Sequence, residues 1–562
     1  MTKEYKVYWD NIEKTPIVIN ESRNEIANYK DLSYMATDLR PVFFEEKALL
    51  EILFPKEAKN ILLSSVWANK QGIYFINGEK KLRSVRKKAK KYSLDSIRSK
   101  ISQFQATDEV IAFEQNLINK FIKFNSRHLQ NLLYSQERDS EGFFKGAEPF
   151  IQEIIKTHEN RVQCVSFSGG KDSTVVSQLV TKTLNNPSVL HIFGDTTLEF
   201  PETYEYLENF MYKNNNTPFF VEKNESSEFM DICNKIGPPS RVKSWCCSIF
   251  KTGPMGTTLA EMNANILTFY GVRRHESASR SKYLKVSQSP KIKKQIVASP
   301  IIDWLDIDVW LYILTEKIDF NISYRRGFTR VGCWCCPNNS DWSDFLNSIY
   351  NVNNYTKWHK FLLKFAQSIG KIDFEEYINS GNWKARQGGD GLENSFINVN
   401  SKTCKDEESA KTFSLTRPID NDFFELLKPF GNLNYDIGRK NLGEVFIVDN
   451  DNNLLMKITG KIGSNQVRIA ILSDLTTVYP VNNINNTIFN YIERQIRKFQ
   501  SCIYCKACDS SCPVSAINVS NSVYKIDENK CVNCLKCLTH FNKGCLIASA
   551  LVTKNRNSEN EY

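Results

Sequence analysis

One decapeptide constrains the fold of this chain more than any other stretch, because residues 165–174 read V-S-F-S-G-G-K-D-S-T. The apolar run 162–165 that leads into it predicts a strand. The apolar residues that follow have the spacing of a helix, at Val175, Val176, Leu179, Val180 and Leu184. A strand, a Ser-Gly-Gly turn and a helix N-terminus form a phosphate cradle, since glycines allow close approach and the helix dipole favours negative charge. The alternative is a plain glycine turn capped by Asp172.

The turn is not a Walker A loop, because G-x-x-x-x-G-K-[ST] is missing. Its S-G-G-x-D-S pattern resembles the PP-loop ATP pyrophosphatases, which typically cleave ATP between the α- and β-phosphates. Three more segments follow in order: F-G-D-T-T-L-E-F-P-E-T-Y at 193–204, G-V-R-R-H-E-S-A-S-R at 271–280, and S-P-I-I-D-W-L-D-I-D-V-W-L-Y-I at 299–313. Together they resemble the phosphoadenosine phosphosulfate (PAPS) reductase family in its broad sense, over residues 145–345. The resemblance implies an α/β fold, with a PP-loop (HUP-type) parallel sheet and flanking helices.

The resemblance also implies a site for ATP and Mg²⁺. The residues predicted to bind the nucleotide are Ser168, Gly169, Gly170, Lys171, Asp172, Ser173, Asp195, Gly271 and Arg273. The predicted catalytic residues are Lys171, Asp172, Arg273 and Arg274. Lysine and arginine make charge-assisted contacts to phosphate or sulfate, and Asp172 is a candidate Mg²⁺ contact. Asp195 follows a strand, at the edge where open α/β sheets bind ligands. The alternative for the arginines is a solvated basic loop.

One missing segment favours ATP chemistry. Sulfonucleotide reductases carry a catalytic cysteine in a C-terminal E-C-G-x-H segment, and this sequence has no such segment. They also generally lack the complete S-G-G-K-D-S, because they bind a sulfonucleotide and do not hydrolyse ATP. Both differences favour an ATP-dependent enzyme.

Eight of the sixteen cysteines gather near the C-terminus, as C-x2-C-x2-C-x3-C-P and C-x2-C-x2-C-x7-C. The first pattern is typical of bacterial ferredoxins, in which the fourth cysteine ligates the other cluster. One predicted [4Fe–4S] cluster is therefore held by Cys502, Cys505, Cys508 and Cys545. The second is held by Cys531, Cys534, Cys537 and Cys512. The alternative is a pair of zinc sites.

Four more cysteines form a third candidate metal site. Cys246 and Cys247 are adjacent, and Cys333 and Cys336 form a later C-x-x-C. This arrangement looks like the cluster-binding set of iron–sulfur sulfonucleotide reductases, and it implies a third [4Fe–4S] cluster. Zinc or free thiols are the alternatives. Cys335 is the spare cysteine. A structural role is expected for it, and the alternative is that it carries a persulfide.

A cytoplasmic protein without a membrane segment is expected. The N-terminus has no apolar signal core, and no apolar run approaches the length of a membrane span. In such a compartment, sixteen cysteines favour metal binding over disulfides.

We predict five regions. They are an N-terminal α+β accessory region (1–145), the PP-loop catalytic domain with a helical extension (146–400), a small β-rich domain (413–495), a two-cluster ferredoxin-like α+β domain (496–552) and a disordered tail (553–562). Residues 401–412 read as a linker. The basic run 79–91 could track a nucleic-acid backbone, and the net charge of +10 (73 minus 63) agrees in sign. The alternative is a solvated helix face.

The motifs together predict an ATP-dependent, iron–sulfur-dependent sulfur transfer, in which an acceptor is adenylated and then thiolated. A nucleic acid, tRNA or DNA, is the expected acceptor. A persulfide donor such as a cysteine desulfurase and an electron donor are the expected partners. One alternative is a reductase that releases sulfite from adenylyl or phosphoadenylyl sulfate with ferredoxin electrons. Another is a nucleotide-sensing, nucleic-acid-binding subunit.

Overall fold

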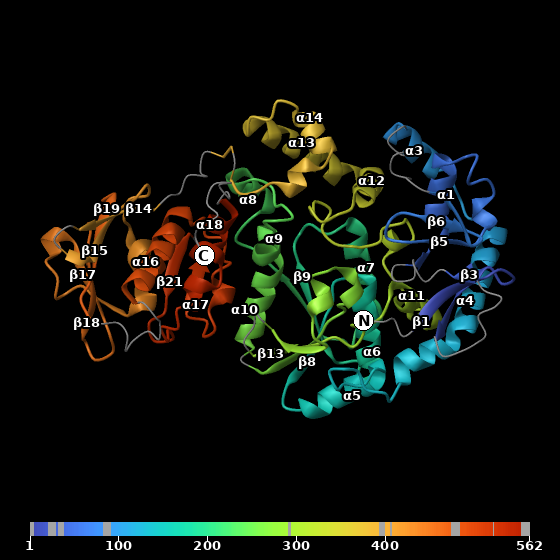
Figure 1. Cartoon of the computed structure of the whole chain (residues 1–562), viewed down its shortest axis with the longest axis horizontal. Coiled ribbons are helices and arrows are strands. Elements are labelled where there is room, and N and C mark those ends of the chain that lie inside the picture. The colour runs from blue at the N-terminus through green and yellow to red at the C-terminus, as the bar shows by residue number, and fades with distance from the viewer. Residues whose placement is uncertain are drawn as a thin grey trace. The chain divides into compact units, whose positions relative to one another are not determined.

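The structure is a computed structural model. It describes residues 5–20, 30–31, 39–82, 92–262, 264–289, 294–389, 391–392, 399–404, 407–473, 484–520 and 522–551. Residues 83–91 of the basic run and the predicted tail at 553–562 lie outside these ranges. The chain forms two compact units (Figure 1). Unit 1 comprises residues 1–221, 264–290 and 294–358, and unit 2 comprises residues 222–263, 291–293 and 359–562.

A six-stranded sheet carries the predicted phosphate loop. Its strands are β8 (Val162–Ser166), β9 (Leu190–Asp195), β10 (Phe219–Lys223), β11 (Ile266–Phe269), β12 (Val286–Gln288) and β13 (Gln295–Ala298). The strand order is β10-β9-β8-β11-β13-β12. The β8–β9, β8–β11 and β11–β13 pairs are parallel, and β12 is antiparallel to β13. The predicted α/β fold class is confirmed.

Helices flank this sheet (Figure 1). In unit 1 they include α5 (Ala147–Thr157), α6 (Lys171–Leu184), α7 (Pro201–Lys213) and α11 (Asp306–Thr315). Val176 and Leu179 of α6 are at most 1% exposed and share a core with Phe269 of β11. Burying each side chain of this size contributes about 1.5–3 kcal/mol. The strand predicted at 162–165 and the helix predicted after residue 174 are both confirmed.

The N-terminal part of unit 1 contains two small antiparallel sheets. The first has the order β2-β1-β3, and the second has the order β4-β5-β6-β7. Their strands are β1 (Tyr5–Asp10), β2 (Thr15–Asn20), β3 (Lys30–Asp31), β4 (Arg40–Pro41), β5 (Val66–Ala68), β6 (Tyr74–Ile76) and β7 (Glu79–Leu82). The neighbouring helices are α1 (Phe44–Leu53), α3 (Leu94–Ile101) and α4 (Asp108–Tyr134).

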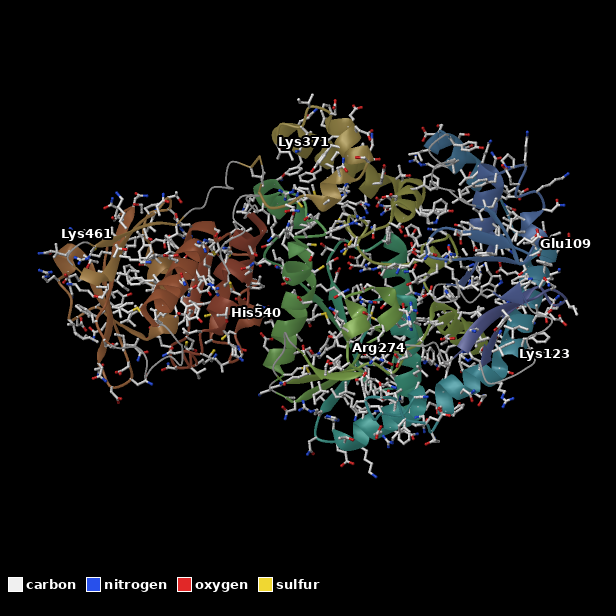
Figure 2. The ribbon with its side chains drawn as sticks, in the orientation of Figure 1. Glu109, Lys123, Arg274, Lys371, Lys461 and His540 are labelled. Atoms are coloured by element: carbon white, nitrogen blue, oxygen red, sulfur yellow. The ribbon has the colours of Figure 1, made fainter. Side chains whose placement is uncertain are left out.

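The N-terminus of the long helix α4 is capped by a side chain. The Thr107 side chain accepts a hydrogen bond from the Val110 N–H and caps the helix, and Asp108 and Glu109 place negative charge in the first turn. Figure 2 labels Glu109 on this helix. The cap and the helix dipole together explain why the helix starts here.

Unit 2 includes a six-stranded antiparallel sheet of order β14-β15-β19-β18-β17-β16. Its strands are β14 (Asn400–Cys404), β15 (Glu407–Ser414), β16 (Asn432–Asn434), β17 (Glu444–Val448), β18 (Leu454–Thr459) and β19 (Gln466–Ile471). The linker expected over 401–412 is wrong, because most of that segment forms β14 and β15. β15 pairs with β19, and Ala410 and Phe413 of β15 are buried, which explains why this polar-looking segment joins the sheet.

Helix α16 (Ile484–Ser501) joins that sheet to the cysteine-rich C-terminal segment. Its apolar residues, including Ile488, Ile492 and Ile496, share one core with sheet residues such as Ile447 and with Tyr524 of the C-terminal hairpin. The predicted domain boundary between residues 495 and 496 therefore falls inside α16, a helix that packs against both the antiparallel sheet and the C-terminal segment.

The remaining elements follow the same two units. Unit 1 also holds α12 (Asp341–Tyr350), and α13 (Val352–Ser368) begins in it. Unit 2 also holds α8 (Phe229–Ile236), α9 (Trp245–Cys247), α10 (Gly253–Glu261), α14 (Phe374–Asn379), α15 (Asn421–Glu425), β20 (Ile517–Ser520), β21 (Val523–Ile526), α17 (Lys536–Thr539) and α18 (Leu546–Leu551). Within the part of the chain that the structure describes, no helix combines the length and the apolar character needed to cross a membrane.

Candidate functional site

The Ser-Gly-Gly turn between β8 and α6 has the backbone that an anion cradle needs. Gly169 has a φ of +70°, which side chains rarely adopt, and Gly170 precedes the first turn of α6. Ser173 closes the loop, because its Oγ accepts the Ser168 N–H at 3.1 Å and donates to the Gly170 carbonyl at 2.9 Å. The N-terminus of α6 is thus presented at the carboxyl end of β8.

A second loop, after β11, lies against this turn. A Cβ on Gly271 would come within 2.6 Å of the Asp172 carbonyl carbon, so glycine is required there. β8 lies between β9 and β11, and the chain passes from β8 to β9 on one side and returns to β11 on the other. The carboxyl ends of β8 and β11 therefore form a topological switch point, where open α/β sheets bind their ligands.

Four charged side chains interlock at this point. Lys171 Nζ lies 3.0 Å from Asp172 Oδ2 and 3.2 Å from Asp306 Oδ1. Arg273 Nε lies 2.6 Å from Asp172 Oδ1, and Arg273 Nη2 lies 2.5 Å from Asp306 Oδ1. Both cationic side chains are 5% exposed, whereas the carboxylates are about 15% exposed. Lys171, Asp172 and Arg273 are among the predicted site residues, whereas Asp306 had no predicted role.

Mutual pairing keeps these groups charged despite burial. Burial alone would lower the pKa of Lys171, but the Asp172 and Asp306 carboxylates outweigh it and raise that pKa. Burial would raise the pKa of Asp172, but Arg273 and Lys171 outweigh it and lower that pKa. The site thus holds two fixed cations and two fixed anions next to the loop.

Tyr324 is a loop contact that the sequence analysis missed. Its hydroxyl accepts the backbone N–H of Lys171 at 3.0 Å, and its ring lies under the Lys171 ammonium at 5.6 Å. Burial raises the pKa of this hydroxyl. Tyr324 lies outside the four quoted segments, so no motif pointed to it.

Arg274 is directed into a different ion-pair cluster from its neighbour Arg273. It pairs with Glu141 and Asp303, and its Nε donates to the Tyr283 carbonyl. Figure 2 labels it in unit 1. A catalytic role for Arg274 stays a prediction.

Asp195 ends β9 and anchors the loop that follows it. Its Oδ1 accepts the Tyr204 hydroxyl at 2.8 Å, and that hydroxyl also reaches Glu199 at 3.3 Å. Thr196 donates to the buried Glu199, and its Oγ1 lies 3.3 Å from the Cys333 sulfur. The first cysteine of the C-x-x-C therefore lies beside the loop of the predicted nucleotide ligand Asp195.

Known proteins resemble this chain in the segment that carries the phosphate loop. The model of the phosphoadenosine phosphosulfate reductase domain matches residues 163–339. The adenosine 5'-phosphosulfate reductase of Oceanobacillus iheyensis is 30% identical over 206 residues, which cover 35% of this chain and 81% of that protein. The chain belongs to the phosphoadenosine phosphosulfate reductase family.

A second relative is the uncharacterized protein MJ0066 of Methanocaldococcus jannaschii, 30% identical over 260 residues and 45% of this chain. The chain spans half the length of this relative. Among solved structures, the phosphoadenylyl-sulfate (PAPS) reductase of Candida auris, in a phosphate complex, covers 41% of this chain and 97% of its own at 17% identity, with a TM-score of 0.28. The PAPS reductase domain model ends at residue 339, so the C-terminal cysteines lie beyond it.

The cysteines predicted to hold a third cluster lie in different units. Cys246 and Cys247 lie on α9 in unit 2, and Cys333 and Cys336 lie in unit 1. Within unit 2, residues of α18, which follows Cys545 directly, approach α9 to within 8 Å between Cα atoms. The third cluster stays a prediction.

The eight cysteines of the two predicted quartets all lie in unit 2. The thiol of Cys505 interacts electrostatically with those of its three predicted partners, Cys502, Cys508 and Cys545. Cys531 interacts with Cys512 and Cys534, and Cys537 interacts with Cys508 of the first quartet and with Cys512 and Cys531 of its own. All four cysteines of the second quartet line one cavity of about 20 Å³.

Both cysteine loops have the same unusual backbone. The residues on either side of the second cysteine have left-handed φ angles in each loop, with 57° and 60° at Tyr504 and Lys506, and 48° and 56° at Asn533 and Leu535. Left-handed backbone costs energy for non-glycine residues, so its repetition at equivalent positions shows that the two loops share one local backbone shape. The backbone N–H of Tyr504 donates a hydrogen bond to the Cys502 sulfur, and the backbone N–H of Asn533 donates one to the Cys531 sulfur.

One buried hydroxyl also fits an anionic sulfur ligand. Tyr524 is 1% exposed, and its hydroxyl has no nitrogen or oxygen partner in the described part of the chain. It interacts instead with the thiols of Cys508, Cys537 and Cys502. Sulfur atoms of a bound cluster would accept this donor.

Single-ion sites are not formed by the described residues. In these ranges, no three Cys, His, Asp or Glu side chains converge as ligands of one metal ion. In a [4Fe–4S] cluster each of four thiolates binds a different iron, so the thiolates need not converge on one point. Burial raises the pKa of Cys502 and Cys537 to about 12, so binding any metal would release protons.

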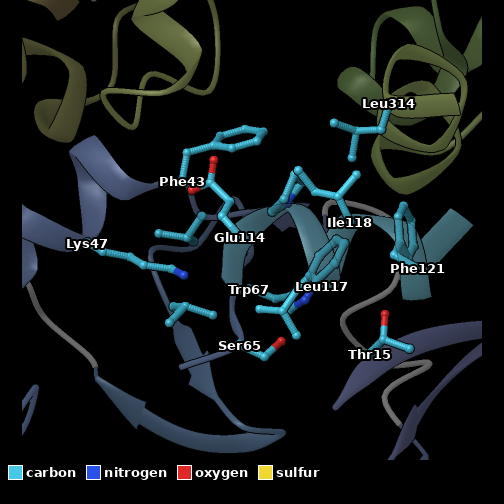
Figure 3. Close-up of a pocket in the computed structure, with 13 residues that line it drawn as sticks. Thr15, Phe43, Lys47, Ser65, Trp67, Glu114, Leu117, Ile118, Phe121 and Leu314 are labelled. Atoms are coloured by element: carbon cyan, nitrogen blue, oxygen red, sulfur yellow. The ribbon is translucent and has the colours of Figure 1, made fainter. Parts of the chain in front are cut away.

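A further cavity lies in the N-terminal part of unit 1 (Figure 3). It has a volume of about 30 Å³ and an apolar lining that includes Phe43 and Trp67. Lys47 reaches it, donates to the Ser64 carbonyl at 2.9 Å and has a pKa lowered to about 8 by burial. A space of this size holds one or two water molecules, so it is no nucleotide site.

Proposed function

We propose that this chain is an ATP-dependent sulfurtransferase that adenylates an acceptor and then thiolates it. The observation that carries the proposal is the pair of buried cations, Lys171 and Arg273, held beside the glycine turn at the switch point. Two fixed cations and a carboxylate at a helix N-terminus suit a Mg²⁺-polyphosphate better than a single sulfate.

The first step consumes ATP. An acceptor oxygen attacks the α-phosphorus, the bond between the α-phosphorus and the bridging oxygen breaks, and pyrophosphate leaves with the β- and γ-phosphates. Where the attacking oxygen carries a proton, that proton passes to solvent. Lys171 and Arg273 would stabilise the developing charge, and Asp172 would hold Mg²⁺. Arg274 stays a candidate for the same role from the next position along the loop.

The second step forms the carbon–sulfur or phosphorus–sulfur bond. The terminal sulfur of a persulfide attacks the acceptor carbon or phosphorus that bears the adenylated oxygen, the bond from that atom to the oxygen breaks, and AMP leaves with the oxygen. The product is a disulfide between acceptor and carrier, and the persulfide proton is released to solvent. Two electrons and one proton then cleave the sulfur–sulfur bond, giving the thiolated acceptor and the carrier thiolate. A persulfide donor, such as a cysteine desulfurase, and an electron donor are therefore the partners we propose.

The C-terminal quartets would supply the electrons. Cys502, Cys505, Cys508 and Cys545 would hold one [4Fe–4S] cluster, and Cys512, Cys531, Cys534 and Cys537 would hold the other. Clusters of this type accept and release single electrons, so a pair can hold the two that the cleavage needs. We propose a third cluster at Cys246, Cys247, Cys333 and Cys336. The cavity lined by the second quartet and the matched loop backbones support the C-terminal pair.

We propose a nucleic acid, tRNA or DNA, as the acceptor. The net charge of +10 favours a polyanionic partner. The sequence run 79–91 contributes to this charge, and most of it lies outside the described residues.

The second candidate is a sulfonucleotide reductase, favoured by the similarity to the adenosine 5'-phosphosulfate reductase of Oceanobacillus iheyensis. Such an enzyme would release sulfite and AMP from adenylyl sulfate, with two electrons from the C-terminal clusters. No ATP would be consumed.

An anaerobic assay separates the two candidates. Purified protein is given ATP with tRNA or with DNA, or adenylyl sulfate alone, and pyrophosphate and sulfite are measured. We expect pyrophosphate release that depends on an acceptor and is lost in Lys171→Met. Lys182→Met, which removes a half-exposed lysine on the same helix, is the matched control. Sulfite release without pyrophosphate would establish the reductase instead.

A further inference from the structure

A buried lysine lies close to cysteines of both C-terminal quartets. Lys498 is on α16 and is 1% exposed, and its Nζ donates to the Cys537 carbonyl at 2.9 Å. Its ammonium interacts with the thiols of Cys508 and Cys545 in the first quartet and with that of Cys537 in the second. The side chain therefore faces both predicted cluster sites at once.

Among the residues that the structure describes, no Asp or Glu forms an ion pair with Lys498. The groups that raise its pKa most against burial are cysteine thiols. A charge taken out of water costs several kcal/mol unless an opposite charge accompanies it. Two clusters bound by thiolates would supply that opposite charge on both sides of Lys498.

We propose that Lys498 is a fixed internal cation that raises the reduction potentials of both C-terminal clusters. This inference rests on the proposed clusters. Each one-electron reduction adds negative charge next to the ammonium, so the ammonium stabilises the reduced form more than the oxidised form. Because the site is buried, salt does not screen this interaction as it screens surface charges.

The sequence offers a matched control. Lys525 lies on β21 next to the buried Tyr524, but its own side chain is exposed. A lysine charge in water acts through a high dielectric constant and contributes little at the same distance. Removing Lys525 therefore tests whether the loss of an exposed lysine charge is enough to change the reduction potentials.

The test is an EPR-monitored redox titration of the anaerobic full-length protein with dithionite. Four variants are compared with the natural chain: Lys498→Met, Lys498→Gln, Lys498→Arg and Lys525→Met. Iron is counted on each sample, and about eight atoms indicate a filled pair of C-terminal clusters. We expect Lys498→Met and Lys498→Gln to lower the equilibrium constant for reducing both clusters by at least about tenfold, or about 59 mV for one electron. Lys498→Arg and Lys525→Met should leave it unchanged.

The outcomes separate this inference from the function on which it rests. Unchanged potentials in both neutral variants, with full iron, would overturn it and leave the clusters in place. Failure of Lys498→Arg to preserve the potential would also overturn it, because shape would then matter and charge would not. Loss of iron in both neutral variants but not in Lys498→Arg would show that the charge at position 498 is needed for cluster assembly. That result would refute a role in setting the potential. A natural chain without C-terminal clusters would overturn the cluster proposal itself, and this inference with it.

Discussion

The backbone of Gly271 lies against the backbone of Asp172, so that a Cβ at position 271 would meet the Asp172 carbonyl carbon at 2.6 Å. Two loops separated by about a hundred residues of sequence thus touch at the point where the nucleotide is proposed to bind. The first prediction follows from this contact.

Gly271→Ala should move the phosphate loop. Because the new methyl group meets backbone and no flexible side chain, we expect a loss of about 1–3 kcal/mol in stability and about tenfold weaker ATP binding. Isothermal titration calorimetry measures the binding. Gly332→Ala is the control, since a Cβ there has no neighbour within 4 Å. Unchanged affinity in Gly271→Ala would show that ATP does not use this loop.

Asp306→Asn should weaken the protein without ligand and increase its response to ATP. The change leaves Lys171 and Arg273 with one carboxylate between them, which costs about 3 kcal/mol. A bound polyphosphate replaces the missing negative charge, so ATP should raise the unfolding temperature more in this variant than in the natural protein. Differential scanning fluorimetry with and without ATP measures both effects. Asp303→Asn, half-exposed in the original protein, is the control, and a smaller ATP response in Asp306→Asn would contradict the prediction.

His191 should make unit 1 sensitive to mild acid. It is fully buried, its Nδ1 lies 2.8 Å from the Val189 carbonyl oxygen, and burial lowers its pKa from 6.5 to about 4. A lowered folded-state pKa means that the unfolded chain takes up the proton first. Stability is therefore intact above pH 6.5 and is lost progressively as the pH falls to about 4, by up to about 3 kcal/mol.

Urea denaturation at about pH 7 and about pH 5 checks this. His191→Asn should lose less stability between the two pH values than the natural protein does. His158→Asn, at a half-buried helix end, should retain the full loss. Equal losses in the natural protein and in His191→Asn would rule out His191 as the cause.

Single cysteine substitutions should remove one C-terminal cluster at a time. Cys505→Ala and Cys545→Ala should lower the iron content by about four atoms and abolish the same EPR signal, because both belong to the first quartet. Cys534→Ala should abolish the other signal. Cys164→Ala, which changes a buried cysteine of β8, should lose no iron. A loss of different signals in Cys505→Ala and Cys545→Ala would disprove the predicted exchange of fourth ligands.

The sequence alone predicted the fold of the phosphate loop and much of its charge. The glycines, Lys171 and Asp172 are contiguous and form a local pattern, and Arg273 follows the glycine that touches them. Asp306 was within a quoted segment but received no role, because only the folded sheet brings the N-terminus of α11 to the loop. Tyr324 was missed entirely, since a single tyrosine about 150 residues downstream carries no local signal.

In the β-rich part of unit 2, some strands could be predicted from the sequence and others could not. The β-rich domain predicted over residues 413–495 contains β17, β18 and β19, whose apolar residues favour strands. β14 and β15 are rich in Lys, Thr, Ser and Glu, so their composition suggested a linker. Pairing with β19 overrides that local preference, and such pairing cannot be read from either segment alone.

Helix α9, which carries Cys246 and Cys247, shares unit 2 with the C-terminal segment and lies next to α18. A chain shortened before residue 484 would keep this cysteine pair but would strip its helix of covering residues that come from the far end of the sequence. Such a truncation, which removes the C-terminal cysteines, would therefore also remove packing around a cysteine pair that lies about 250 residues earlier. Point substitutions such as Cys505→Ala are the way to silence one region while leaving the other folded.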